Sequence, residues 1–177
     1  MPVQKKEKPK EETNMNPVRF VENKGILLCG NNGSDAGSAW HKWEETSVGH
    51  PELKCGLSYD PHNNPGAFEV RFYPPEGEYV FVGTQMSQTE SESKWDYMQI
   101  PETIYAVFDI DCKIDQGPQF AGLNEWLHNN KEKYKRFIWD VNGKINPAEF
   151  VICVYDHTNK FAKEQIMEMW VSLVENE

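Results

Sequence analysis

Aromatic side chains are the residues of this sequence best suited to bind a ligand. The 177 residues include six Trp, seven Tyr and nine Phe, so 12% of the chain is aromatic. Ser34 is a favourable helix N-cap, and it predicts a helix on which Trp40 and Trp43 share one face. Such rings either fill a core or wall a pocket, where their faces attract planar and cationic molecules. Both interpretations are open from the sequence.

Other chemically active side chains do not combine into a catalytic or metal-binding pattern. Cys153 has no base beside it, because His157 comes four residues later, past the predicted strand end, and a buried structural Cys is expected. The acidic and His pairs Asp109-Ile-Asp111, Asp60-Pro-His62 and Asp156-His157 give too few ligands for zinc or iron. We therefore predict no catalytic residue, no metal and no cofactor.

The charge and hydropathy of the chain limit its partners. The formal net charge is -10 and the sequence pI is about 5.0, which argues against direct nucleic-acid binding because phosphate contacts need clustered Lys and Arg. The same acidity favours positively charged small ligands. The sequence has neither an apolar run of about 20 residues nor a signal-peptide pattern, so no membrane contact and a cytoplasmic location are expected.

The predicted elements are arranged around a central strand. From Thr103 to Ile110, apolar and β-branched residues alternate after Pro101, which is typical of a strand start. Further strands are predicted over 18–29, 53–60, 67–73, 78–86, 150–155 and 166–174, the last with a helical alternative from Phe161 onward. Helices are predicted over 34–49 and 118–130.

Each half of the chain therefore runs strand, helix, strand, strand, as an internal duplication would. Tyr59 and Tyr155 each follow a Trp by sixteen residues, which supports the repeat. We predict an α+β fold in which duplicated βαββ units form an antiparallel sheet, with two helices on one face and a ligand cleft between them. Residues 1–16 are predicted to be a disordered tail and residues 17–177 the domain.

Several short motifs follow one another in a distinctive order. They are Trp40-x-x-Trp43, Cys55-Gly-Leu-Ser-Tyr59, Glu78-Tyr-Val-Phe-Val-Gly83, Ile100-Pro-x-x-x-Tyr-Ala-Val-Phe108, Phe150-x-x-Cys-Val-Tyr-Asp156 and Met167-Glu-Met-Trp-Val171. In this order they resemble the GyrI-like effector-binding domain, the ligand module of many AraC- and MerR-type regulators of drug response. The resemblance covers about residues 17–175.

The resemblance implies a cleft that binds planar, often cationic, aromatic molecules, for drug or xenobiotic sensing or sequestration. As a free-standing domain without a helix-turn-helix unit, the chain would regulate transcription only through a separate protein. The residues implied to contact the ligand are mainly aromatic: Trp40, Trp43, Tyr59, Tyr79, Tyr105, Trp126, Trp139, Cys153, Tyr155, Glu168 and Trp170.

One position departs from the family pattern. The family commonly has a Glu two residues before the Tyr of the penultimate strand, where this chain has Cys153. A neutral thiol cannot attract a cation as a carboxylate does. Another acid then replaces the Glu, with Glu168, Glu78 and Asp109 as candidates, or the ligand is neutral. Two alternatives stay open: a hydrolase of a planar xenobiotic in the same cleft, and a protein-binding module of the gyrase-inhibitor type.

Overall fold

A computed structural model describes residues 15–22, 25–48, 66–75, 77–86, 95–140, 147–156 and 160–177. These residues form ten strands and three helices. In chain order they are β1 (Arg19–Glu22), β2 (Leu27–Gly33), α1 (Ala36–Val48), β3 (Gly66–Phe72), β4 (Tyr79–Met86), β5 (Asp96–Gln99), β6 (Ile104–Asp111), α3 (Gly117–Asn129), β7 (Tyr134–Arg136), β8 (Ile138–Trp139), β9 (Ala148–Asp156), α4 (Lys160–Glu164) and β10 (Ile166–Glu175).

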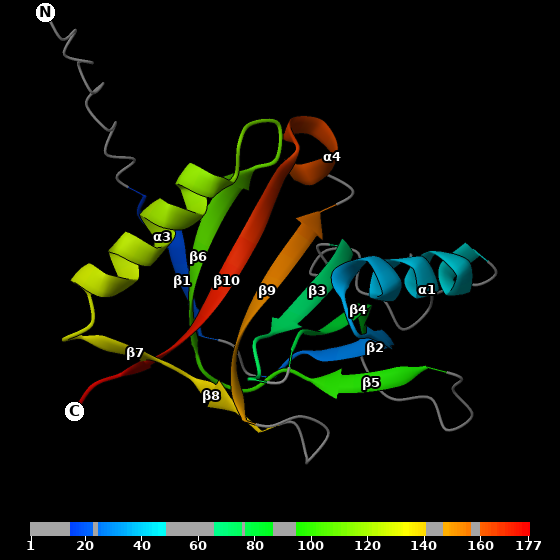
Figure 1. Cartoon of the computed structure of the whole chain (residues 1–177), viewed down its shortest axis with the longest axis horizontal. Coiled ribbons are helices and arrows are strands. Elements are labelled where there is room, and N and C mark those ends of the chain that lie inside the picture. The colour runs from blue at the N-terminus through cyan, green and yellow to red at the C-terminus, as the bar shows by residue number, and fades with distance from the viewer. Residues whose placement is uncertain are drawn as a thin grey trace, which may run out of the picture.

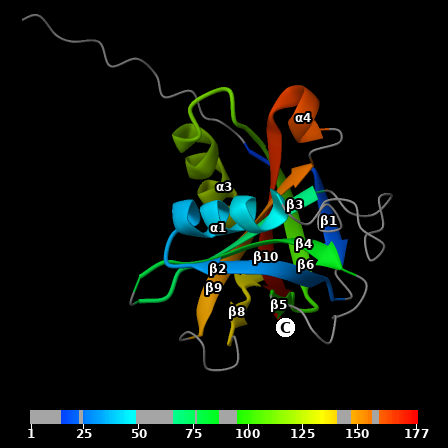
Figure 2. The same cartoon turned by 90° about the vertical axis from the view of Figure 1, so that its right-hand side faces the viewer.

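The sheet contains two βαββ units of the same topology, which confirms the predicted α+β fold. The strand order is β1-β6-β10-β9-β3-β4-β2-β5, with all pairs antiparallel. In the unit β2-α1-β3-β4 the last strand lies between the other two, and β10 lies likewise between β6 and β9. The two units meet where β3 pairs with β9. Figures 1 and 2 show both helices over the same sheet.

The strand register places α1 and α3 on one face. Glu69 on β3 is paired with Val82 on β4 and with Cys153 on β9, and residues paired in this way share a face. Val82 packs under α1 with the buried Trp43. Cys153 belongs to the cluster that includes Leu123 of α3. Strands β3 and β9 therefore lie between the part of the sheet that α1 covers and the part that α3 covers.

A second core fills the opposite face of the sheet. Its largest fully buried side chains include Tyr105, Phe72 and Phe150. Strands β2 and β5 run across the direction of β6 and β10, so the sheet is strongly twisted (Figure 1). The backbone N–H of Ile100 donates to the carbonyl of Ile26 at 2.8 Å and continues the pairing of β5 with β2. Much of the aromatic content is therefore packed away from the groove.

The boundaries of several elements differ from those predicted. Helix α1 is capped by Asp35 and not by Ser34, because the Asp35 Oδ1 accepts the N–H of Ser38 at 2.8 Å. The strand prediction for the last element is correct, and helix is confined to α4. Among the described residues, the strand that follows α1 is β3. The predicted strand 53–60, with Tyr59, lies outside the described residues. So do residues 1–14 of the predicted tail.

A close backbone contact between β2 and β4 predicts a strict need for glycine. Gly30 is paired with Gly83, and a Cβ added at Gly30 would lie 2.0 Å from the carbonyl oxygen of Val82. We expect Gly30→Ala to lower the free energy of unfolding by about 3 kcal/mol, as forced overpacking does. Gly37→Ala, in the first turn of α1, should change it by less than about 1 kcal/mol. Urea denaturation measures both, and equal effects would contradict the register.

Candidate functional site

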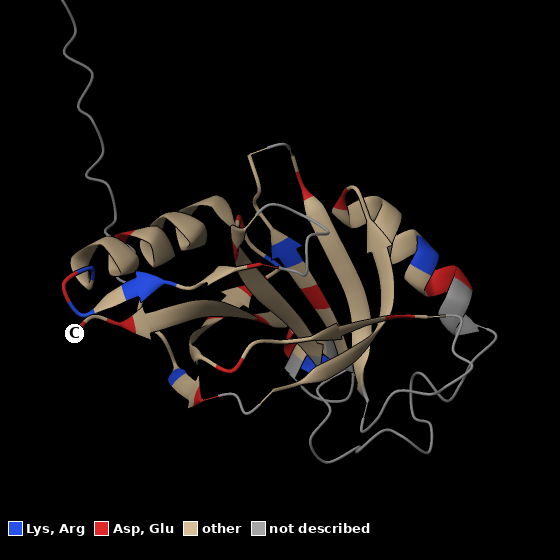
Figure 3. Ribbon diagram, turned by 90° about the horizontal axis from the view of Figure 1, so that it is seen from below, with Lys and Arg blue, Asp and Glu red and all other residues tan. Residues whose placement is uncertain are grey.

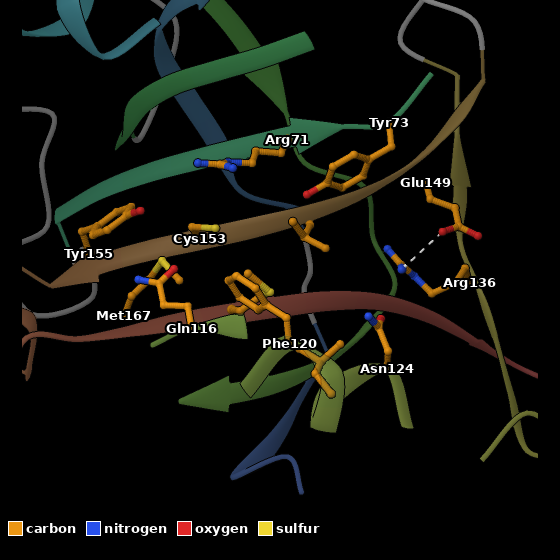
Figure 4. A pocket seen from close by; sticks show the side chains of 13 residues that line it. Arg71, Tyr73, Gln116, Phe120, Asn124, Arg136, Glu149, Cys153, Tyr155 and Met167 are labelled. Atoms are coloured by element: carbon orange, nitrogen blue, oxygen red, sulfur yellow. Dashed lines mark ion pairs between the residues drawn. The ribbon is translucent and has the colours of Figure 1, made fainter. Parts of the chain in front are cut away.

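A pocket of about 400 Å³ lies between α3 and strands β3, β9 and β10. Figure 4 shows its side chains. Gln116, beside the start of α3, Phe120 and Asn124 approach it from the helix side. Residues four apart lie on the same side of a helix, which explains why these three converge. The helix-covered face of the sheet therefore contains a pocket large enough for a small organic ligand, and this pocket is lined by α3 and not by α1.

The sheet supplies the floor of the pocket through alternate residues of neighbouring strands. Arg71 of β3 and Cys153 and Tyr155 of β9 face the helices. Met167 and Met169 of β10 continue the same face. Alternation along a strand points every second side chain to one face, and the register then places the three rows side by side. The pocket thus depends on residues that are far apart in the sequence.

The carboxylate missing at Cys153 is present on the adjacent strand. Glu69 lies directly opposite Cys153 and is only 1% exposed. It accepts hydrogen bonds from Nε1 of Trp40 and from Nε of Arg71. The sequence interpretation missed Glu69, although an acid inside the apolar run Ala67–Phe72 was a signal that it is buried with a partner.

Arg71 neutralises that buried carboxylate. Its guanidinium is about one-third exposed and forms an ion pair with Glu69. Burial works against the charged guanidinium, but the hydrogen bond and negative charge of Glu69 outweigh it and raise the pKa of Arg71. Glu78, one of the predicted replacements, lies 4.0 Å from Arg71 Nη1. Arg71 therefore lines the pocket, and the carboxylate that it compensates is buried beside it and does not line the pocket.

Tyr155 lies at one end of the pocket between two other rings. Trp40 meets it edge-on with a centroid distance of 5.3 Å, and Phe161 of α4 does the same at 5.0 Å. Burial raises the pKa of Tyr155, and the neighbouring Cys153 and Glu69 act in the same direction, so its phenol is neutral at physiological pH. This end of the pocket combines an aromatic wall with a neutral hydroxyl.

Cys153 is held as a protonated thiol. It is 2% exposed, and burial raises its pKa, with the negative charge of Glu69 as the next cause. Because the thiolate is the nucleophilic form of Cys, this environment makes Cys153 a poor nucleophile. Its position in the pocket wall suits contact with a bound molecule and not covalent attack.

Tyr73, Arg136 and Glu149 form the opposite end of the pocket (Figure 4). The backbone N–H of Tyr73 donates to the carbonyl of Glu149 at 3.1 Å and brings the ends of β3 and β9 together. Arg136, on β7, donates through Nη2 to the carbonyl of Phe150 at 2.7 Å. Its Nη1 lies 3.4 Å from Glu149 Oε2. The sequence interpretation did not select these three residues. Arg136 lies on β7, which was not predicted, Glu149 precedes the predicted strand 150–155, and Tyr73 ends a predicted strand without any signal for a ligand.

The remaining sequence candidates lie outside this pocket. Trp43 is buried beneath α1. Trp126 lies on the side of α3 that is away from the pocket, where it packs against Phe20 and Tyr134. Four aromatic candidates belong to the core on the opposite face: Tyr79, Tyr105, Trp139 and Trp170.

The acidic candidates Glu168 and Asp109 also lie away from the pocket. They are paired across β10 and β6, on the face opposite α3. Glu168 accepts two hydrogen bonds of 2.7 Å from Arg19 and one of 3.0 Å from Trp170. Arg19 is also attracted to Asp109, and the hydrogen bond to Glu168 is the main cause of its raised pKa. The ion pair between Arg19 and Glu168 therefore links β1 to β10.

The described part of the chain has neither a cluster of metal ligands nor a helix that could span a membrane. Within it, no group of three or more His, Cys, Asp and Glu side chains is placed to hold a metal ion. None of its helices is long and apolar enough to cross a membrane.

Comparisons with known proteins find similarity in structure alone. No family model matches the sequence, and no curated protein matches it. The structure of SAV2435 bound to tetraphenylphosphonium aligns with a TM-score of 0.57 at 13% identity, over 88% of this chain and 93% of that one. A Staphylococcus aureus MU50 structure, named for bacterial transcription regulation, aligns with a TM-score of 0.56 at 12% identity, over 88% and 96%. At this identity the alignments show a shared fold.

The buried ion pair generates a prediction about stability. Arg71→Met would leave the Glu69 carboxylate buried without its charge partner, and we expect it to lower the free energy of unfolding by about 3 kcal/mol. The double variant Glu69→Met with Arg71→Met should recover much of that loss, because no charge is then buried. Glu78→Gln, which alters a partly exposed acid, should cost less than about 0.5 kcal/mol. Urea denaturation at pH 7 tests this, and a double variant less stable than Arg71→Met would contradict the pairing.

The environment of Cys153 predicts low reactivity. We expect iodoacetamide to leave Cys153 unmodified in the folded protein between pH 7 and 9, because its thiol is buried and its pKa is raised. The partly exposed Cys112 should be modified progressively as the pH rises, and Cys153 should react once urea unfolds the chain. Peptide mass spectrometry reports each site separately. Rapid modification of Cys153 in the folded protein would contradict its buried position in the wall of the pocket.

Proposed function

We propose that this pocket binds an aromatic small molecule, and that the chain is an effector-binding domain of the GyrI-like type that senses or sequesters drugs or other xenobiotics. The observation that carries the proposal is the pocket itself. It joins aromatic and apolar walls, from Phe120, Leu123, Met169 and Tyr155, to a few polar groups at its two ends. This combination is typical of small-molecule sites, which commonly enclose about 300–1,000 Å³.

The side chains of the walls suit ligands of varied shape. Met167 and Met169 have flexible, polarizable side chains that adapt to different surfaces, and Phe120 provides a ring that a planar molecule can stack on. Such a site accommodates several related compounds, as expected for sensing or sequestration. Tetraphenylphosphonium, named with the structure of SAV2435, is a bulky aromatic cation, and its presence in a protein of this fold supports a ligand site in the present chain.

The regulatory part of the proposal rests on the family resemblance and on the second structural neighbour. That neighbour is named for transcription regulation. The net charge of -10 opposes direct contact with nucleic acid, so we propose that a bound ligand acts through a separate regulatory protein. The hydrolase alternative gains nothing from the pocket, since Cys153 is protonated and the described lining residues include no His that could act as its base.

A pair of matched tryptophan substitutions tests the proposed site. Asn124 is exposed at the edge of the pocket, and Asn124→Trp should fill the opening without disturbing the core. We expect it to weaken binding of the neutral fluorescent probe N-phenyl-1-naphthylamine by about tenfold or more. Glu125→Trp adds the same ring at the next exposed residue of α3, which does not line the pocket, and should leave the affinity unchanged.

The measurement is a fluorescence titration of the probe, followed by mass spectrometry of the recovered compound. The expected result is saturable binding of a probe that stays chemically intact. Binding should be weakened in Asn124→Trp and unchanged in Glu125→Trp. Equal losses in both variants would place the probe elsewhere on the protein. The absence of saturable binding would reject the proposed function, and a chemically altered probe would favour the hydrolase alternative.

A further inference from the structure

The charges that line the pocket are mainly positive. Arg71 and Arg136 face it, and the only acid among the described lining residues is Glu149, which is about half exposed. The buried Glu69 does not line the pocket, and its oxygens already accept hydrogen bonds from Arg71 and Trp40. A cationic ligand would therefore approach two guanidinium groups before it reached a buried carboxylate. This arrangement opposes the cation preference that the sequence resemblance implied.

Arg136 has unused capacity to donate hydrogen bonds. A guanidinium carries five N–H donors and accepts none. Its bond to the carbonyl of Phe150 is short, but its 3.4 Å contact with Glu149 is longer than the 2.7–2.9 Å of a good charge-assisted bond. The Nε is buried and finds no acceptor among the residues that the structure describes. A buried donor without an acceptor is costly, so an acceptor brought by a ligand would stabilise this group.

Tyr73 adds a neutral donor at the same end of the pocket. Figure 4 shows Tyr73 at the end of the pocket where Arg136 and Glu149 lie, with its hydroxyl directed toward the middle of the pocket. Burial raises the pKa of Tyr73, and although Arg71 and Arg136 act against this shift, the phenol keeps its proton at neutral pH. A hydroxyl and a guanidinium that approach one space from β3 and β7 can both donate to the oxygens of one carboxylate.

We propose, as an extension of the small-molecule function above on which it rests, that the preferred ligand is an aromatic carboxylic acid. Its carboxylate is bound at the end of the pocket formed by Arg136 and Tyr73, and Arg71 is a further positive side chain that lines the pocket. Its aromatic part lies along Phe120 toward Tyr155. Glu149 occupies the same guanidinium from the solvent side in the free protein, and the ligand carboxylate replaces that loose contact with a closer one.

The acidic surface does not oppose this preference inside the pocket. At physiological salt the field of exposed charges falls off within about 8 Å, so the local arginines dominate for a molecule that is already bound. The net charge of -10 acts on the approach of an anion instead. We therefore expect the acid to associate more slowly at low salt than at physiological salt. Once bound, it should be held more tightly than a neutral compound of the same shape.

Three compounds with one ring system separate charge from shape. Naphthalene-1-acetate is anionic, naphthalene-1-acetamide is neutral and 2-(1-naphthyl)ethylamine is cationic at pH 7. Isothermal titration with the full chain at 0.15 M salt measures their dissociation constants. We expect the acetate to bind about tenfold or more tightly than the amide, as hydrogen bonds to charged groups do, and the amine to bind most weakly.

Substitutions at the end of the pocket formed by Tyr73, Arg136 and Glu149 then show which residues cause the preference for the acetate. Glu149→Gln removes the competing carboxylate from Arg136 and should tighten acetate binding several-fold, a gain that misfolding cannot produce. Arg136→Met should weaken acetate binding about tenfold, and Tyr73→Phe, at a half-exposed residue, should weaken it two- to fivefold. All three should leave the affinity for the amide within twofold. Arg19→Met removes an arginine on the far side of the sheet and controls for net charge.

The possible outcomes distinguish this inference from the proposed function. If the amide or the amine binds as tightly as the acetate, and Arg136→Met has no selective effect, the ligand class is wrong while the small-molecule site stands. If none of the three compounds binds and the neutral probe also fails, the site itself is rejected. Equal changes in Arg19→Met and Arg136→Met would show a general charge effect and overturn the assignment of the carboxylate site.

Discussion

The pairing of β3 with β9 is the interaction on which the rest of this structure depends. Seven consecutive residue pairs, from Gly66 with Asp156 to Phe72 with Phe150, join the two βαββ units into one sheet. Each unit alone would leave an open strand edge with unsatisfied backbone groups, which proteins avoid. The joint also decides which side chains meet. A shift of one residue would turn Glu69 and Arg71 to the opposite core and remove the floor of the pocket.

Burial of a carboxylate at this joint has consequences for the ligand. Glu69 is placed where the pocket floor crosses from one unit to the other, and it is held there by Arg71 and Trp40. A buried charge is tolerated only with a partner, so the carboxylate and the guanidinium come as a pair. Because the carboxylate and Arg71 compensate each other, the positive group left for a ligand is mainly Arg136, whose 3.4 Å contact with Glu149 is loose. The carboxylate preference that we propose is thus opposite in charge to the aromatic cation named with the structure of SAV2435, which shares the fold.

The aromatic residues divide between structure and site. The motif tryptophans and tyrosines were the main functional signal in the sequence, yet Trp43, Tyr105 and Trp170 are packed in the cores. Large rings bury much apolar area, and a chain with a modest share of aliphatic residues uses them to build its interior. Of the predicted set, Cys153 and Tyr155 line the pocket and Trp40 supports it from α1. Motif membership alone did not separate these roles.

The sequence by itself determined the α+β class, the duplicated βαββ plan, both large helices and the strand that became β6, because these follow from local periodicity. It also determined that one face of α1 and one of α3 are apolar. The tertiary structure alone decided which residues form the pocket. Glu69 becomes the counterpart of Cys153 only through the register of β3 with β9, and Arg136 reaches the pocket only because β7 pairs with β10. Both contacts join residues distant in the chain, and periodicity within one segment contains no information about its partner.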